Sequence, residues 1–171
     1  SDAQYNLGKL YLKGKYIERN ISKAIQYFTL AANQNHPDAQ FILGNLYEKG
    51  KFVERDIDKA IHYYSLAANQ NEPRAQNNLG NLYAQGELVE RNFSKALYYY
   101  TLAANLNYDH AQFNLGNLYL RKEFINYDVD KAIHYFTLAA NQNHSDAQFN
   151  LGVLYEKGKF VERDIDKAIH Y

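Results

Sequence analysis

Apolar and polar positions along the chain follow an amphipathic pattern that returns at a fixed interval. In the stretch 38–50, DAQFILGNLYEKG, apolar residues recur every three or four positions, which is the spacing of one face of a helix. The pattern Ala-x-x-x-Leu-Gly-x-x-Tyr returns every 36 residues, starting at Ala3, Ala39, Ala75, Ala111 and Ala147. A constant period of this size predicts a stacked array of repeats rather than a globular core.

Each unit also contains a second amphipathic pattern, KAIHYYSLAA at 59–68 in the second unit, which we expect to form a second helix. A residue suited to cap that helix precedes it in every unit, because its side-chain oxygen can accept a free helical N–H. These caps are Asn20, Asp56, Asn92, Asp128 and Asp164. The predicted fold class is therefore all-α, a solenoid of helix–turn–helix repeats with units at about 1–36, 37–72, 73–108, 109–144 and, in part, 145–171.

Glycines occupy two fixed places in the first helix of each unit. Gly44 and its equivalents lie inside the helix, where glycine costs roughly 1 kcal/mol, so we expect a close approach of the partner helix there. Gly14, Gly50, Gly86 and Gly158 are expected to end the helix in the left-handed conformation. The fourth unit has Lys122 instead, so either Lys122 adopts that conformation at a cost or the helix continues and the loop changes shape.

Asparagine is expected to take the left-handed conformation after the second helix, at Asn35, Asn71, Asn107 and Asn143. The recurring tyrosines, with Tyr47 and Tyr63 as the example of the second unit, are expected to belong to the core with their hydroxyls at its edge.

The amino-acid composition limits the classes of partner that we expect this chain to bind. Nineteen basic and nineteen acidic residues cancel, which removes the usual electrostatic case for nucleic acid or an anionic membrane surface. No apolar run approaches the length of a membrane span, so direct membrane insertion is not expected, and the absence of cysteine leaves the compartment open. The chain starts at Ser1 and stops inside a repeat, so we interpret it as an excerpt of a longer protein. The uncapped ends, 3–7 and 169–171, predict end-to-end self-association of the chain.

These motifs together resemble the Sel-1-like repeat, a relative of the tetratricopeptide repeat. The resemblance covers essentially all of residues 1–171 and implies a right-handed superhelix whose concave wall is formed by the first helices. It implies a protein–protein interaction scaffold or adaptor, without enzymatic activity and without a cofactor, that binds a protein or an extended peptide in the concave groove. Two alternatives stay open: a regulatory or docking arm of a larger protein, such as an enzyme or kinase, and a β-lactamase-like or penicillin-binding repeat protein.

By the same analogy, the groove would be lined by positions that recur in the first helices. The candidate binding residues are Asp38, Phe41, Asn45, Glu48, Arg74, Asn77, Asn78, Asn81, His110, Phe113, Asn114, Asn117 and Phe149. An asparagine amide both donates and accepts, so one per repeat could pair with the backbone of an extended peptide while the aromatic rings supply apolar contact. The alternative is that these asparagines are solvated surface residues in a chain rich in asparagine.

Catalytic and metal-binding patterns are missing from the sequence. The serines have neither of the usual nucleophile contexts, and no glycine-rich phosphate loop is present. The six histidines do not form the His-x-x-x-His spacing that places two ligands on one helix face, so we expect no catalytic residues and no metal site.

Overall fold

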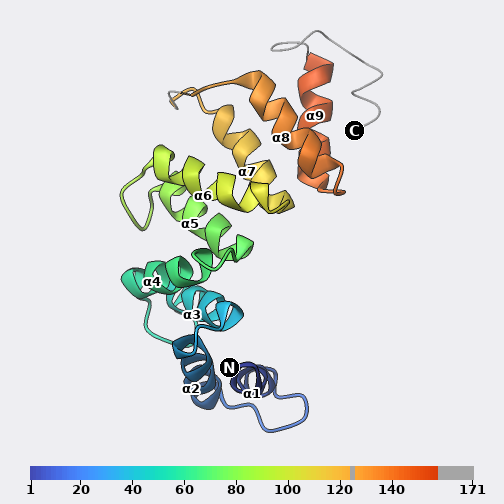
Figure 1. Ribbon diagram of the computed structural model, residues 1–171. Coiled ribbons are helices and arrows are strands. Elements are labelled where there is room, and N and C mark those ends of the chain that lie inside the picture. The colour runs from blue at the N-terminus through green and yellow to red at the C-terminus, as the bar shows by residue number, and fades with distance from the viewer. Residues whose placement is uncertain (124–125, 158–171) are drawn as a thin grey trace. The chain divides into compact units, whose positions relative to one another are not determined.

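The computed structural model describes residues 1–123 and 126–157, which contain nine helices and no strand (Figure 1). The first helices of the repeats are α1 (Asp2–Lys13), α3 (Pro37–Lys49), α5 (Pro73–Gln85), α7 (Asp109–Tyr119) and α9 (Ser145–Lys157). The second helices are α2 (Ile21–Asn33), α4 (Ile57–Ala68), α6 (Phe93–Asn105) and α8 (Val129–Ala140). The chain is thus an all-α helical repeat solenoid with a period of 36 residues, as the pattern predicted. Among the described helices, none has the length and apolar character needed to cross a bilayer.

The helices divide between two compact units. Among the described residues, unit 1 contains 1–79 and 87–89, and unit 2 contains 80–86, 90–123 and 126–157. The division falls within α5, so the first half of that helix belongs to unit 1 and its second half to unit 2. Within each unit, successive helices pack on one another: α1 to α4 in unit 1, and α6 to α9 in unit 2.

The second helices begin where the sequence predicted. Asn20, Asp56, Asn92 and Asp128 are extended, and each side chain accepts a hydrogen bond from the backbone N–H three residues later, at 2.9–3.0 Å. Asp164 lies outside the described residues. Two of these four caps are neutral asparagines and two are aspartates. The same capping hydrogen bond is therefore accepted by a side chain that titrates in two repeats and by one that does not in the other two.

The carboxylate caps make stability depend on pH. The backbone N–H of Lys59 holds the pKa of Asp56 below its usual value, and that of Lys131 does the same for Asp128. Because folding lowers these pKa values, the stabilisation is present above the usual value and is lost as the pH falls through the folded-state value. We expect the melting temperature to fall between about pH 5 and about pH 2, and to fall less steeply in the double variant Asp56→Asn and Asp128→Asn.

The reciprocal variant, Asn20→Asp with Asn92→Asp, adds two titrating caps and is expected to steepen the acid dependence. The melting temperatures of the unchanged chain and of the two double variants are measured across this pH range by circular dichroism. Identical slopes for all three would contradict a contribution of the caps.

The predicted left-handed residues adopt that conformation. Gly14, Gly50 and Gly86 have φ of 63–70°, and a Cβ at any of them would lie within 2.8 Å of the arginine side chain that follows in the loop. Asn35, Asn71, Asn107 and Asn143 have φ of 60–65° and follow the second helices by two or three residues. Gly158 lies outside the described residues.

Neither alternative considered for Lys122 is correct. The helix α7 does not continue, and Lys122 is not among the described non-glycine residues with positive φ. Instead α7 ends early, at Tyr119, and Leu120 closes it with a right-handed backbone. The Leu120 N–H donates to the Gly116 carbonyl at 3.3 Å, and the Arg121 N–H donates to the Leu118 carbonyl at 3.1 Å. Ending the helix before the missing glycine avoids the cost of a left-handed lysine.

The glycine inside each first helix is explained by an aromatic ring of the second helix. At Gly44 an added Cβ would lie 2.5 Å from the Tyr64 ring, and at Gly116 it would lie 2.5 Å from the Phe136 ring. Phe28 and Tyr100 occupy the same place against Gly8 and Gly80. All four rings are buried, so the close approach expected at these glycines is confirmed, and its partner is a ring of the second helix.

The other recurring tyrosines lie at the edge of the core rather than inside it. Tyr11 stacks on Tyr27, and the pair recurs in the next three repeats with centroids 5.7–6.0 Å apart and nearly parallel rings. In each pair a lysine from the start of the second helix lies over the ring from the first helix, at 4.7–5.3 Å. Most of these rings remain partly exposed, which corrects the expectation of a core position.

Candidate binding site

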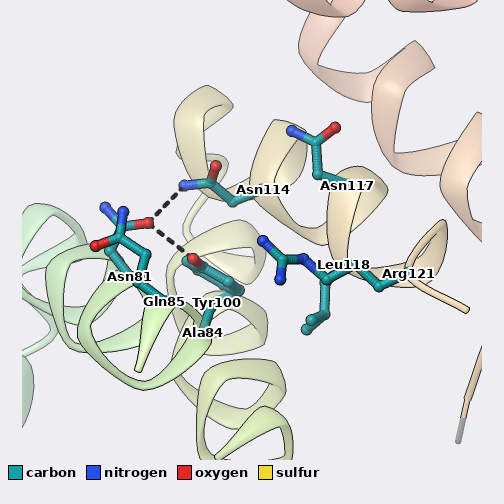
Figure 2. Close-up of a pocket in the computed structure, with 8 residues that line it drawn as sticks. All are labelled: Asn81, Ala84, Gln85, Tyr100, Asn114, Asn117, Leu118 and Arg121. Carbon is teal, nitrogen blue, oxygen red and sulfur yellow. Dashed lines mark hydrogen bonds between the residues drawn. The ribbon is translucent and has the colours of Figure 1, made fainter. Parts of the chain in front are cut away.

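A polar cavity of about 340 Å³ lies in unit 2, where the second half of α5 faces α7 (Figure 2). Its lining consists of Asn81, Ala84, Gln85, Tyr100, Asn114, Asn117, Leu118 and Arg121. Three of these, Asn81, Asn114 and Asn117, were predicted as binding residues from their positions in the first helices. The structure therefore brings the predicted asparagines of two consecutive repeats to one hollow.

Asn81 is the centre of the hydrogen bonds at this cavity (Figure 2). Its Oδ1 accepts from the Tyr100 hydroxyl at 2.7 Å and from Asn114 Nδ2 at 3.2 Å. The same kind of bond links the next two repeats, where Asn150 Nδ2 donates to Asn117 Oδ1 at 3.4 Å. The asparagines thus hold consecutive first helices together through one oxygen each, and the amide nitrogen of Asn81 and that of Asn117 keep their donor capacity.

Arg121 is the one charged side chain among the eight lining residues, and it comes directly after α7. In Figure 2 its guanidinium extends from the end of α7 toward Tyr100 and Asn114. It is half-exposed, lies 5.7 Å from the centre of the Phe93 ring, and forms a long ion pair of 3.9 Å with Glu123. An exposed pair of that length contributes little, so the cavity has a cation that a ligand could engage.

Burial raises the pKa of Tyr100 well above its usual range, against the opposing influence of the positive charge of Arg121. The hydroxyl therefore stays protonated and donates to Asn81 at any ordinary pH. This keeps the cavity free of negative charge, since its lining contains amides, a neutral phenol and a guanidinium.

In unit 1 the predicted residues Asp38, Phe41 and Arg74 form a different arrangement. The Arg74 guanidinium pairs with Asp38, donates to Glu72 at 2.7 and 2.8 Å, and lies 4.4 Å from the centre of the Phe41 ring. Hydrogen bonds to Glu72, followed by those to Asp38, raise the pKa of Arg74. Two carboxylates already satisfy this arginine, so it is less available to a ligand than Arg121.

Tyr64, also in unit 1, donates its hydroxyl proton to Glu48 Oε2 at 2.5 Å and accepts from Asn78 Nδ2 at 3.1 Å. Burial, together with the bond to Glu48, raises the pKa of Tyr64 beyond its usual range. The predicted residues Glu48 and Asn78 are therefore linked through a buried tyrosine that the sequence analysis did not single out.

The remaining predicted residues have different surroundings within their own units. Asn45 donates to the carbonyl of Phe41 in its own helix at 3.1 Å, and Asn77 is buried. Because it is buried, the Asn77 side chain is not available at a binding surface. Phe149 is exposed on α9, whereas His110 and Phe113 contact His144.

Comparison with known proteins assigns the chain to a family. The family model described as Sel1 repeat matches residues 1–36, 37–72, 73–108, 109–144 and 145–171, which is the whole chain. The chain belongs to the Sel1 repeat family. Proteins built from Sel1 repeats are typically scaffolds for protein interactions, and the described solenoid agrees with that architecture.

Solved Sel1 repeat structures are similar over almost the full chain. A protective antigen of uropathogenic Escherichia coli with this repeat fold is 29% identical with a TM-score of 0.91, and a Sel1 repeat protein of Oxalobacter formigenes is 33% identical with a TM-score of 0.90. Each match covers 99% of this chain, but this chain spans only 38% of the E. coli protein and 70% of the O. formigenes protein. The cysteine rich protein B of Helicobacter pylori shares the fold at 24% identity and a TM-score of 0.58, over 78% of this chain and 96% of its own. Comparison with curated protein sequences gives no match.

Two features of the Sel1 repeats were missed by the sequence analysis. Gln40 is buried, donates to the carbonyl of Ala32 at 3.2 Å and accepts from Gln70 at 2.7 Å, so it satisfies the end of the preceding helix. Its equivalents in sequence are Gln4, Gln76, Gln112 and Gln148, and this recurrence was the available signal.

Arg121 was missed as well, although four of the five repeats carry a basic residue at its position, one residue before the loop glycine or its replacement.

Proposed function

We propose that this chain is a scaffold that binds an extended, acidic peptide segment across the second half of α5 and α7. The observation that carries the proposal is the cavity of about 340 Å³ in which amides and a single guanidinium converge. A volume of this size lies at the lower end of ligand pockets, so it suits one or two side chains of a longer peptide rather than a large cofactor.

The chemistry of the lining supports this choice. The amide nitrogens of Asn81 and Asn117 can donate to the C=O groups of an extended backbone, which requires no particular peptide sequence. Arg121 adds selectivity, because a guanidinium binds a carboxylate through two parallel hydrogen bonds that are stronger than neutral ones. Exchange of the long contact with Glu123 for a peptide carboxylate costs little.

We propose that the predicted residues Phe41 and Arg74 of unit 1 form a second surface that contacts peptide. Phe41, under the guanidinium of Arg74, offers a flat apolar surface of the kind that peptide side chains contact. Because its two carboxylates neutralise Arg74, we assign the charge selectivity to Arg121 in unit 2 rather than to this cluster.

A random peptide library displayed on phage and panned against the chain tests the proposal. We expect enriched peptides to contain Asp or Glu, and the variant Arg121→Gln to weaken the binding of an enriched synthetic peptide by about tenfold or more in fluorescence polarisation, since a hydrogen bond between charged groups contributes about 1.5–3 kcal/mol. The matched control is Lys122→Gln, which removes the same charge from the next residue, an exposed one outside the cavity lining. We expect that control to bind like the unchanged chain.

Two results would overturn the proposal: panning that enriches no peptide above background, or equal affinity for Arg121→Gln and the unchanged chain. A similar loss in Arg121→Gln and Lys122→Gln would show that only the net charge of the chain matters.

A further inference from the structure

The start of α7 and the turn before α9 bring together two histidines and a carboxylate. His110 Nδ1 lies 3.2 Å from His144 Nε2, and a ligand atom of Asp109 completes a group in which all three atoms lie within 4.8 Å of one another. The two histidines are 34 residues apart in sequence and come from consecutive repeats of unit 2. We propose that these three side chains form a binding site for a divalent transition-metal ion such as Zn²⁺.

The spacing of the two ring nitrogens suits a metal ion. Bonds between zinc and histidine nitrogen are about 2.0–2.1 Å, so two such ligands of a tetrahedral ion lie about 3.3 Å apart. The observed 3.2 Å is that spacing. A rotation of the Asp109 side chain brings its carboxylate into the third position and leaves the fourth for water, with two imidazoles and one carboxylate forming a set that such ions accept.

His144 has the rigidity expected of a ligand. It is 8% exposed, and its ring stacks on Phe113 with centroids 4.7 Å apart. His110 meets it edge to face at 5.0 Å and is itself flanked by the ring of Tyr108 at 5.4 Å. This shell restricts the motion of the His144 ring, which reduces the entropy lost when an ion binds.

Without an ion the two imidazole rings are joined by a hydrogen bond. His144 Nδ1 accepts from the N–H of Ala147 at 3.4 Å, so its proton resides on Nε2 and is donated to His110 Nδ1. When an ion binds, that proton moves to Nδ1 and the contact with Ala147 is lost. The loss is small, because the Ala147 N–H also donates to the His144 carbonyl at 3.1 Å.

The start of α3 provides a comparison, because His36 stands there at the position equivalent to His144. His36 is the N-cap of α3 as His144 precedes α9, and its ring stacks on Tyr5 at 4.4 Å. Its Nε2 faces Asp2 Oδ1 at 3.6 Å, so this corner has one imidazole where the other has two. The site we propose therefore depends on His110, which replaces the aspartate found at residues 2, 38 and 146.

Titration calorimetry of the full chain with Zn²⁺, in the absence of a histidine tag, tests the inference. We expect one ion per chain, and binding weakened by at least about tenfold in His110→Asn and in His144→Asn. Asparagine at residue 144 retains an acceptor for the helix start, and the matched control His36→Asn makes the same change at the equivalent cap. The control is expected to bind Zn²⁺ like the unchanged chain, and Co²⁺ is expected to give the visible absorption of a tetrahedral site only where both histidines of the pair are present.

The inference is overturned if neither Zn²⁺ nor Co²⁺ binds the unchanged chain, or if the double variant His110→Asn and His144→Asn still binds one ion. Equal losses in His36→Asn and His144→Asn would also overturn it. Far-UV circular dichroism verifies folding of each variant, and His110→Asn, at an exposed position, keeps the test decisive if His144→Asn does not fold.

Discussion

Replacing Phe136 by alanine is expected to lower the free energy of unfolding by about 3–5 kcal/mol, the largest effect of any single change considered for this chain. The side chain is 0% exposed and fills the space between α7 and α8, against Gly116 and Phe113. Removing the ring loses its transfer free energy and leaves a cavity that the rigid glycine-containing helix cannot close. Urea unfolding followed by far-UV circular dichroism makes the measurement.

Phe149→Ala is the matched control, since that phenylalanine lies at the same distance from the repeat glycine in sequence as Phe113 but is 69% exposed. We expect it to change the free energy of unfolding by less than about 0.5 kcal/mol. Similar losses for Phe136→Ala and Phe149→Ala would contradict the assignment of Phe136 to the core.

The second large effect is expected for Gly116→Ala, and its sign follows from two opposing terms. Alanine favours a helix interior by about 1 kcal/mol over glycine. The new methyl group, however, would lie 2.5 and 2.6 Å from two ring atoms of Phe136, and overpacking of this kind costs about 1–3 kcal/mol or more. Because the ring is fully buried and cannot move aside, we expect the steric term to dominate and the variant to lose about 1–2 kcal/mol.

The same substitution is expected to become stabilising when the ring is absent. In the Phe136→Ala background the methyl group meets a cavity, so the gain in helix propensity of about 1 kcal/mol remains without the clash. The double-mutant cycle should therefore give an interaction energy of about 2 kcal/mol or more. Additive effects of the two changes would show that Gly116 and Phe136 do not constrain each other.

Local features of the fold were predictable because one residue decides each of them. A cap such as Asn20 or Asp56 requires only a side-chain oxygen before a helical pattern, and a left-handed residue such as Gly50 or Asn71 depends on its own backbone. The end of α7 was predicted less well. Once the glycine was replaced by Lys122, several backbone solutions of similar energy existed, and packing selected the early end at Tyr119.

The candidate site was predictable only in part. The spacing of the first-helix residues indicated that Asn81 and Asn117 share a face, and both line the cavity. It did not distinguish Asn77, which is buried, from Asn78, which bonds to Tyr64, because adjacent residues differ by only 100° around a helix. Arg121 lies beyond the helical part of the pattern, so its contribution depends on how α7 ends.

The sequence by itself determined the period, the helices, their caps and the family, since all of these are local patterns repeated every 36 residues. Only the tertiary structure decided which ring of a tyrosine or phenylalanine pair is buried against glycine, and which polar groups meet. Tyr63 and Tyr64 are adjacent in sequence, yet one stacks at the edge of the core and the other fills it. His110 and His144 meet because neighbouring repeats stack, a contact between residues 34 apart that no helical spacing indicates.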